Sequence, residues 1–169
     1  EDFTIDPADY KRENGGIIIA NPNAPTGLTL TFDEVEKIVA SNPDNVVIMD
    51  EAYMAFCGES CMELVKKYNN LLVTRTFSKS HSLAGLRVGF GIGSKELIAD
   101  LNKLKFSFNP YNINTLSVKA AAAAIADNEY YDDKISQIVE IREKVTAQLR
   151  ELGFTCTNSK SNFIFASSD

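Results

Sequence analysis

One segment of the sequence combines a lysine with groups that bind phosphate. In the stretch TFSKSHSLAGLR, Lys79 has Thr76 and Ser78 before it and Arg87 after it. A lysine amine forms an imine with a carbonyl once it has lost its proton, and hydroxyl and guanidinium groups donate hydrogen bonds to a phosphate dianion. The stretch is therefore suited to hold an aldehyde that carries a phosphate.

Asp50 and Tyr53 belong to a second segment whose side chains could bind a ligand, VVIMDEAY. A carboxylate directly after a buried strand can pair with a protonated nitrogen of an aromatic ring, and the nearby phenol can reach an oxygen on the same ring. A structural or metal-binding carboxylate is an equal alternative, and the magnesium-binding strand of an ATPase is another. An ATPase also needs a phosphate loop, but the glycine-rich run at 89–95 lacks the G-x-x-x-x-G-K-[ST] spacing.

The segment NPNAPTG, residues 21–27, predicts a tight turn after a strand. Pro22, Pro25 and Gly27 restrict the backbone, and one X-Pro bond is a candidate for the cis form. Such a turn presents amide groups toward the end of the preceding strand. A simple surface turn explains the same residues.

The three segments occur in the order NPNAPTG, DEAY and TFSKSHSLAGLRVGFGIG, each after an expected strand. In this order they resemble the pyridoxal-phosphate-dependent aminotransferases of fold type I (class I/II), and most closely the histidinol-phosphate aminotransferases. The resemblance implies pyridoxal 5'-phosphate as the cofactor and Lys79 as the catalytic residue, which holds the cofactor as a Schiff base and later moves a proton. The other implied cofactor contacts come from Asp50 (ring nitrogen), Tyr53 (phenolic oxygen), and Thr76, Ser78 and Arg87 (phosphate).

The NPNAPTG segment departs from the family pattern at Ala24, which precedes Pro25 where the family usually has an asparagine that contacts the phenolic oxygen. Asn23 is our substitute candidate for that contact. Tyr111 and Asn112, in the run NPYNIN, are candidates for a substrate contact, because the matching stretch in the family lies near the dimer interface and the neighbouring subunit's site. A turn that leads into a helix is the alternative for these two residues.

By this resemblance we expect transamination, in which an amino group is exchanged between histidinol phosphate and 2-oxoglutarate in histidine biosynthesis. The expected partners are an amino-acid or amino-phosphate substrate and a 2-oxo acid, and the full-length enzyme is expected to be a homodimer in the cytoplasm. Two alternatives stay open: a threonine-phosphate decarboxylase-like enzyme, and the pyridoxal-phosphate-binding sensor domain of a transcription regulator.

Short apolar runs alternate with helical patterns along the chain. We expect strands at 17–20, 46–49, 71–74 and 88–92, and helices after the caps Thr31 and Ser94, at 115–126 and at 130–152. Runs rich in Val and Ile that are separated by helices indicate an α/β fold, a three-layer sandwich with a mainly parallel sheet and helices on both faces. Ligands bind beyond the carboxyl ends of such strands, where Asn23, Asp50 and Lys79 are expected.

The chain is expected to contribute to two domains. Residues 1–127 form part of a large cofactor-binding domain, and residues 128–169 form a connecting helix and the beginning of a small C-terminal α/β domain. The chain begins without Met and stops within a strand-like pattern, so we expect it to be a piece, less than half, of a longer protein. By itself the fragment is expected to be inactive.

The amino-acid composition narrows the classes of protein to which the chain can belong. The 169 residues are 44% hydrophobic, enough for one substantial core, and the formal charge of -6 disfavours nucleic-acid binding, which needs clustered Lys and Arg. No apolar run reaches the length of a membrane span. Cys57, Cys61 and Cys156 are an odd set in a chain without a secretory segment, so we expect reduced thiols and no metal site. His81, the only histidine, is expected to have a loop or packing role.

Overall fold

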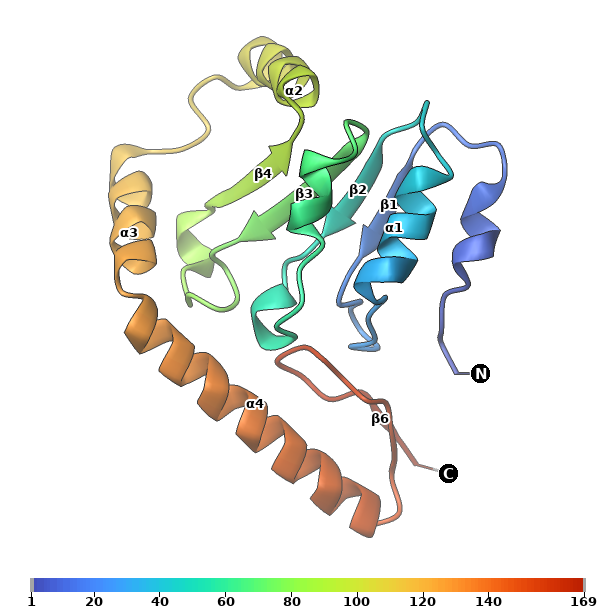
Figure 1. Ribbon diagram of the computed structural model, residues 1–169. Helices are drawn as coiled ribbons and strands as arrows, with labels where there is room; N and C mark the ends of the chain where they lie inside the picture. The colour runs from blue at the N-terminus through green and yellow to red at the C-terminus, as the bar shows by residue number, and fades with distance from the viewer. Residues whose placement is uncertain (1, 169) are drawn as a thin grey trace.

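A four-stranded sheet lies at the centre of the structure, a computed structural model that describes residues 2–168 (Figure 1). Its strands are β1 (Ile17–Ala20), β2 (Val47–Asp50), β3 (Leu71–Thr76) and β4 (Gly89–Gly93), in that order across the sheet. β1, β2 and β3 run parallel, whereas β4 runs antiparallel to β3. The carboxyl ends of the three parallel strands therefore meet at one edge of the sheet.

The main core lies between the sheet and helix α1 (Phe32–Ala40). α1 begins at a capping box, in which Thr31 and Glu34 satisfy each other's backbone N–H groups. Alternate side chains of the parallel strands point toward this helix, because successive residues of a strand face opposite sides. The core residues are Ile17, Ile19, Val35, Ile38, Val39, Val47, Met49, Leu71 and Val73. Since each fully buried aliphatic side chain contributes about 1.5 to 3 kcal/mol, the packing of α1 on the sheet is a main source of stability.

The opposite face of the sheet is open at β1, where the Ile18 side chain is 74% exposed. Figure 1 shows α1 on one face of the sheet, and the other helices lie around its edges. The α/β class with a mainly parallel sheet is confirmed, and the helix layer on the second face stays a prediction.

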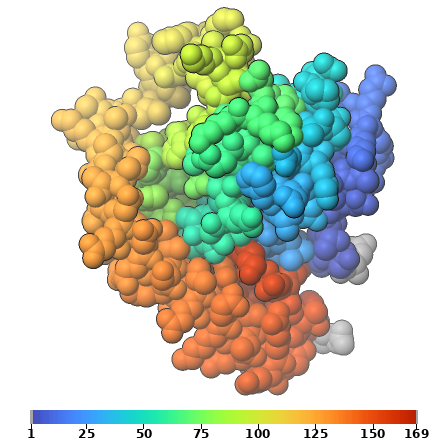
Figure 2. Space-filling model, in the orientation of Figure 1, coloured from blue at the N-terminus to red at the C-terminus, as the bar shows by residue number. Residues whose placement is uncertain are grey.

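Three helices follow the sheet along the chain: α2 (Lys95–Phe108), α3 (Thr115–Ala126) and α4 (Asn128–Glu151). In Figure 1, α3 and α4 form an arc beside and below the sheet, and α4 leads to the antiparallel hairpin of β5 (Thr155–Cys156) and β6 (Ala166–Ser167). Figure 2 shows α4 and this C-terminal segment as one continuous mass below the sheet. The short 3-10 helices are η1 (Pro7–Lys11), η2 (Met54–Phe56), η3 (Met62–Lys66) and η4 (Ala84–Leu86). Every helix within residues 2–168 is too short or too polar to cross a membrane.

The expected elements form, but three of the strands differ in detail. β4 is antiparallel to its neighbour because the segment 77–88 contains only η4, and a parallel return needs a longer crossover, usually through a helix. The strand-like pattern expected near the C-terminal end of the chain gives only the short strands β5 and β6. The reason is a turn in which the Ser159 hydroxyl donates to Phe163 O (2.7 Å) and accepts from Ser161 N (3.2 Å).

Candidate active site

The three sequence motifs begin at one edge of the sheet. Ala20, Asp50 and Thr74 are register partners across β1, β2 and β3. Beyond them, the N–H of Asn21 donates to Asp50 O (2.9 Å) and the N–H of Glu51 donates to Thr74 O (2.9 Å). The sheet therefore places the start of NPNAPTG, the DEAY run and the approach to Lys79 side by side.

The Asp50 carboxylate is oriented by its neighbours at this edge. One oxygen, Oδ1, accepts from the N–H of Ala52 (3.1 Å) and from the hydroxyl of Thr74 (3.2 Å). Within residues 2–168 the other oxygen has no hydrogen-bond partner in the protein. The carboxylate is thus fixed by one oxygen, and the other can accept a hydrogen bond from a ligand.

Lys79 lies on the segment between β3 and β4. The ends of this segment are joined by a hydrogen bond from Phe77 N to Val88 O (3.1 Å), and within it Leu83 N donates to Phe77 O (3.0 Å). The exposed Lys79 side chain reaches over the Tyr53 ring, with its Nζ atom 5.0 Å from the ring centre. Within residues 2–168 no carboxylate forms an ion pair with this amine. The amine is therefore accessible to an incoming carbonyl.

The expected phosphate-binding groups lie on the same segment. The Thr76 and Ser78 hydroxyls are 2.9 Å apart, and Thr76 also accepts from the N–H of Ser78 (3.1 Å). Arg87 is exposed in a left-handed conformation (φ 54°) and its Nη1 donates to Ala84 O (3.0 Å). The remaining N–H groups of this guanidinium have no other protein acceptor among the described residues, so they can bind an anion.

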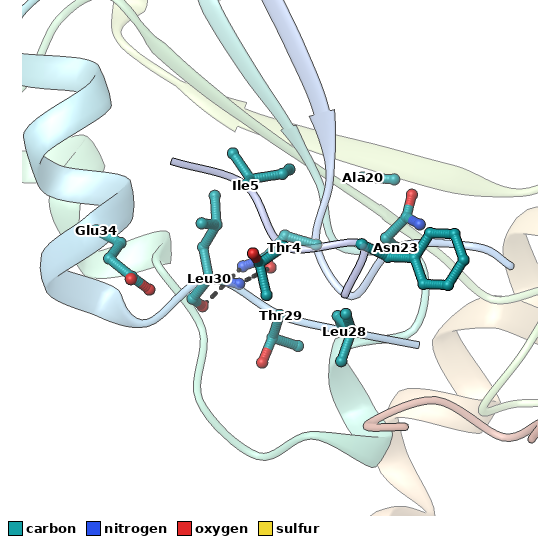
Figure 3. A pocket seen from close by; sticks show the side chains of 10 residues that line it. Thr4, Ile5, Ala20, Asn23, Leu28, Thr29, Leu30 and Glu34 are labelled. Carbon is teal, nitrogen blue, oxygen red and sulfur yellow. Dashed lines mark hydrogen bonds between the residues drawn. The ribbon is translucent and has the colours of Figure 1, made fainter. Parts of the chain in front are cut away.

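The Asn23 side chain makes no hydrogen bond with these groups among the described residues. Its side-chain amide donates to Thr26 Oγ1 (2.8 Å), and it lines a cavity of about 370 Å³ beneath the N-terminal segment (Figure 3). Neither Lys79 nor Tyr53 is among the described residues that line this cavity. The expected contact from Asn23 to a cofactor stays a prediction that no contact in this geometry supports.

Tyr111 and Asn112 lie in the segment between α2 and α3. Both are exposed, Tyr111 by 91%, and no described hydrogen bond or ring contact joins them to Lys79 or Tyr53. Their role toward a substrate also stays a prediction.

Residues near the C-terminus approach the site in a way that sequence analysis missed. The Phe163 ring packs edge-on against Tyr53, with centres 5.1 Å apart. The hairpin also binds the NPNAPTG turn, because Lys160 N donates to Gly27 O (2.7 Å) and the Thr157 hydroxyl donates to Thr26 O (2.7 Å). The sequence indicates only a strand-like pattern at this end of the chain, and nothing in it pairs Phe163 with Tyr53.

Gly27 permits this docking of the hairpin. Its φ of +72° is unfavourable for other residues, and a Cβ atom there would lie 2.5 Å from the Ser159 Cβ. Both X-Pro bonds of the turn, Asn21-Pro22 and Ala24-Pro25, are cis, whereas the sequence suggested one.

Glu51, next to Asp50, is a buried structural carboxylate and is only 1% exposed. It accepts from Arg75 Nε (2.8 Å), from Cys61 N (2.7 Å) and from the Ser60 hydroxyl (2.7 Å). In an ATPase strand of this type the acidic residues face magnesium and nucleotide. Glu51 is not available for that role, so the geometry argues against the ATPase alternative.

His81 packs between Phe77 and Tyr131, with ring centres 5.0 and 4.7 Å away, and its Nδ1 lies 3.0 Å from the Ser80 hydroxyl. Burial lowers the pKa of His81, and the Asp132 carboxylate opposes that shift.

The three cysteines are unpaired. Burial, reinforced by Glu51, raises the pKa of the Cys61 thiol.

The fold and this site define a class of protein. The chain belongs to the aminotransferase class I and II family, whose profile matches residues 1–168. Among curated relatives, the histidinol-phosphate aminotransferase of Brachyspira hyodysenteriae is 56% identical over 168 residues, which are 99% of this chain and 48% of that protein. The histidinol-phosphate aminotransferase of Lactococcus lactis subsp. cremoris is 48% identical over 98% of this chain and 46% of its own length.

The solved structures lead to the same group of proteins. The histidinol-phosphate aminotransferase from Sinorhizobium meliloti, in complex with pyridoxal-5'-phosphate, matches with a TM-score of 0.84 and 26% identity. The match covers 94% of this chain and 44% of that one. The chain therefore spans about half the length of the relatives it matches.

Proposed function

We propose that the complete protein containing this chain is a pyridoxal-phosphate-dependent aminotransferase that exchanges an amino group between histidinol phosphate and 2-oxoglutarate. The observation that carries the proposal is the Lys79 amine over the Tyr53 ring, on a segment that also holds hydroxyl and guanidinium donors. The identity of 56% to a protein named histidinol-phosphate aminotransferase supports this choice of substrate.

The donor set fits pyridoxal phosphate. The cofactor's phosphate needs several donors, and Thr76, Ser78 and Arg87 can supply them from one short segment. Its ring nitrogen needs an anion, and Asp50 has an oxygen without a partner in the described protein. Its aldehyde needs an amine, and Lys79 is exposed. When bound, pyridoxal phosphate supplies an electron sink for cleavage of a bond at an amino-bearing carbon.

The roles of the residues follow from their surroundings. Lys79 would hold the aldehyde of pyridoxal phosphate through its Nζ atom, and its free amine would hold and move a proton at the substrate carbon. Tyr53 keeps that amine over its ring face. Thr74 and the Ala52 N–H hold the Asp50 carboxylate in place, so its charge does not have to be reoriented during the reaction.

We propose that residues outside this chain complete the pocket, and that the 169-residue chain alone does not catalyse the reaction. The support is its coverage of 48% of the relative from Brachyspira hyodysenteriae. We also propose that the boundary between the two domains lies between residues 127 and 128, because α4 leads into a separate two-stranded sheet. A cytoplasmic location, consistent with three unpaired cysteines, stays a prediction.

We propose a homodimer for the complete protein. α2, α3 and the segment between them expose several large apolar side chains: Leu104, Phe106, Phe108, Tyr111 and Leu116. Exposed apolar surface of this kind is typical of interfaces. Light scattering of the full-length protein tests it, and a monomer at micromolar concentration would contradict it.

The function is tested with full-length protein, pyridoxal phosphate, histidinol phosphate and 2-oxoglutarate. We expect glutamate to form, with Lys79→Ala as the inactive control. In a parallel assay with O-phosphothreonine, release of carbon dioxide without glutamate would instead support the decarboxylase alternative. A transcription regulator would carry a DNA-binding segment upstream in the complete sequence and would show neither activity.

A further inference from the structure

Arg142 is a buried cation in the middle of α4. It is 6% exposed, although most of the residues around it on this helix are exposed or half-buried. Burial of a guanidinium is costly unless its N–H groups are satisfied. Glu143, which is half-exposed, accepts from Arg142 Nη2 (2.6 Å) and Nε (3.1 Å). The Nη1 group points the other way, into the protein.

The acceptors of Nη1 are backbone carbonyls on two distant segments. Nη1 donates to Ser161 O (2.7 Å) and makes a longer contact with Phe56 O (3.5 Å). Phe56 ends η2, the turn that follows Tyr53, and its N–H donates to Tyr53 O (3.0 Å). One guanidinium thus binds the turn after Tyr53 and the turn that contains Ser161.

The turn at 159–163 carries the ring that packs against Tyr53. Its backbone is held by the two Ser159 hydrogen bonds, and Ser161 is fully buried. Phe163, at the end of this turn, lies edge-on to Tyr53 with an interplanar angle of 87°. Both carbonyls bound by Arg142 therefore belong to segments that fix the position of Tyr53, and the Tyr53 ring lies beneath the Lys79 amine.

We infer that Arg142 is a positioning residue, which holds the Tyr53 phenol in place for the reaction at Lys79 through the carbonyls of Phe56 and Ser161. This inference rests on the proposed function. Arg142 does not touch the lysine, so its effect passes through Tyr53 and Phe163. A role in stability alone would lower the melting temperature and leave the chemistry at Lys79 unchanged.

The chain contains a matched control on the same helix. Arg150 is exposed and its Nη2 donates to Cys156 O (3.2 Å), so it also joins α4 to the C-terminal hairpin. Its acceptor lies in β5, outside the two segments that fix Tyr53. Arg150→Gln therefore removes a bond between helix and hairpin without loosening Tyr53.

The test uses the full-length protein loaded with pyridoxal phosphate. The main readout is the pH midpoint of the visible absorbance of the bound cofactor, which responds to the phenol of Tyr53. We expect Arg142→Gln to move this midpoint by roughly half a pH unit or more, in the same direction as Tyr53→Phe. Its kcat should fall roughly tenfold, with KM for 2-oxoglutarate nearly unchanged. Arg142→Lys should recover part of the shift, because an ammonium can still donate to Ser161 O.

Arg150→Gln should leave the midpoint unchanged. An unchanged midpoint in Arg142→Gln, whatever its melting temperature, would overturn the inference. If Arg142→Gln does not fold, the pH midpoint is measured in Phe163→Leu instead. A midpoint equal to that of wild type in Phe163→Leu would then overturn the inference too. Failure of the proposed function looks different: the wild-type protein itself would show no visible absorbance with pyridoxal phosphate, and both proposals would fall.

Discussion

The Lys79 Nζ atom lies 5.0 Å from the centre of the Tyr53 ring. The two residues come from different strand ends, Tyr53 after β2 and Lys79 after β3, and the parallel register of these strands brings them together. Because the Lys79 side chain is exposed, its position over the half-buried Tyr53 ring is stabilised by only about 0.5 to 1 kcal/mol. The contact thus orients the amine without preventing it from leaving to react.

The first prediction concerns the lysine itself. In the full-length protein, Lys79→Ala should abolish the visible absorbance band of the imine with pyridoxal phosphate and reduce turnover by roughly a thousandfold or more. Lys79→Arg is the matched control, because it keeps a cation over Tyr53 but its guanidinium does not lose a proton. Both variants should lack the band while the melting temperature stays close to that of wild type. A visible band that persists in Lys79→Ala would contradict the assignment.

The second prediction concerns the docking of the hairpin on the NPNAPTG turn. Gly27→Ala places a methyl group 2.5 Å from the Ser159 Cβ and 2.8 Å from its Cα, in a backbone with φ +72°. We expect a loss of about 2 to 4 kcal/mol in the free energy of unfolding, from strain and displacement of the hairpin together. Urea titration of the full-length protein measures this.

Gly58→Ala is the control that separates backbone strain from displacement of the hairpin as causes of the loss of stability. Gly58 also has a positive φ, +91°, but no described atom lies within 4 Å of the added methyl group. Gly58→Ala should lower the free energy of unfolding by about 1 kcal/mol, from backbone strain alone. Equal losses in the two variants would mean that the contact with Ser159 adds nothing.

The third prediction tests the buried pair of Glu51 and Arg75. Glu51→Gln removes the charge opposite Arg75, whose side chain is 25% exposed, and the new NH2 group of the amide must then face one of the donors that the carboxylate satisfied. Breaking a buried pair costs about 3 to 5 kcal/mol, and partial exposure of Arg75 places the expected loss toward the lower value. Glu63→Gln, which breaks an exposed pair with Lys66, should change stability by less than about 1 kcal/mol. Chemical denaturation of both variants measures the difference.

The sequence predicted the elements whose signals are local. The capping box of Thr31 and Glu34, the cap Ser94 and the apolar runs of the parallel strands all depend on neighbouring residues, and each forms as expected. The antiparallel return of β4 was not foreseen, because glycine-spaced strands carry no signal of direction. Its direction depends on the length of the segment before it.

The site was predictable where its groups belong to the sequence motifs. Thr76 and Ser78 lie in one motif and pair in the structure. Phe163 and Arg142 act on Tyr53 from the far end of the chain, through a ring contact and backbone carbonyls. Carbonyls carry no residue identity, so no sequence pattern could indicate them.

The fourth prediction concerns thiol reactivity. The thiolate is the reactive form, and burial together with Glu51 raises the pKa of Cys61, so its thiolate is scarce at neutral pH. Cys57 and Cys156 are only half-buried. Labelling with iodoacetamide at pH 8, followed by peptide mass spectrometry, should modify these two first and Cys61 only after denaturation. Rapid labelling of Cys61 in folded protein would contradict the packing around Glu51.

The fifth prediction concerns the pH dependence of stability through His81. Burial against Phe77 and Tyr131 lowers the pKa of this histidine below its ordinary value of 6.5, so the unfolded chain takes up the proton first as pH falls. Above pH 6.5 the ring is neutral in both states and contributes nothing. As pH falls below 6.5, the free energy of unfolding decreases, until the folded protein is protonated too.

His81→Phe keeps an aromatic ring between Phe77 and Tyr131 but cannot take up a proton. The loss of stability between pH 7.5 and 5.5, measured by urea titration, should therefore be smaller in this variant than in wild type. Asp132→Asn should act in the opposite direction, because Asp132 supports the protonated ring and its removal lowers the pKa of His81 further. Wild type and His81→Phe have all their other titrating groups in common, so the difference between these two curves reports on His81. Parallel curves for wild type and His81→Phe would show that the ring is protonated equally in the folded and unfolded states.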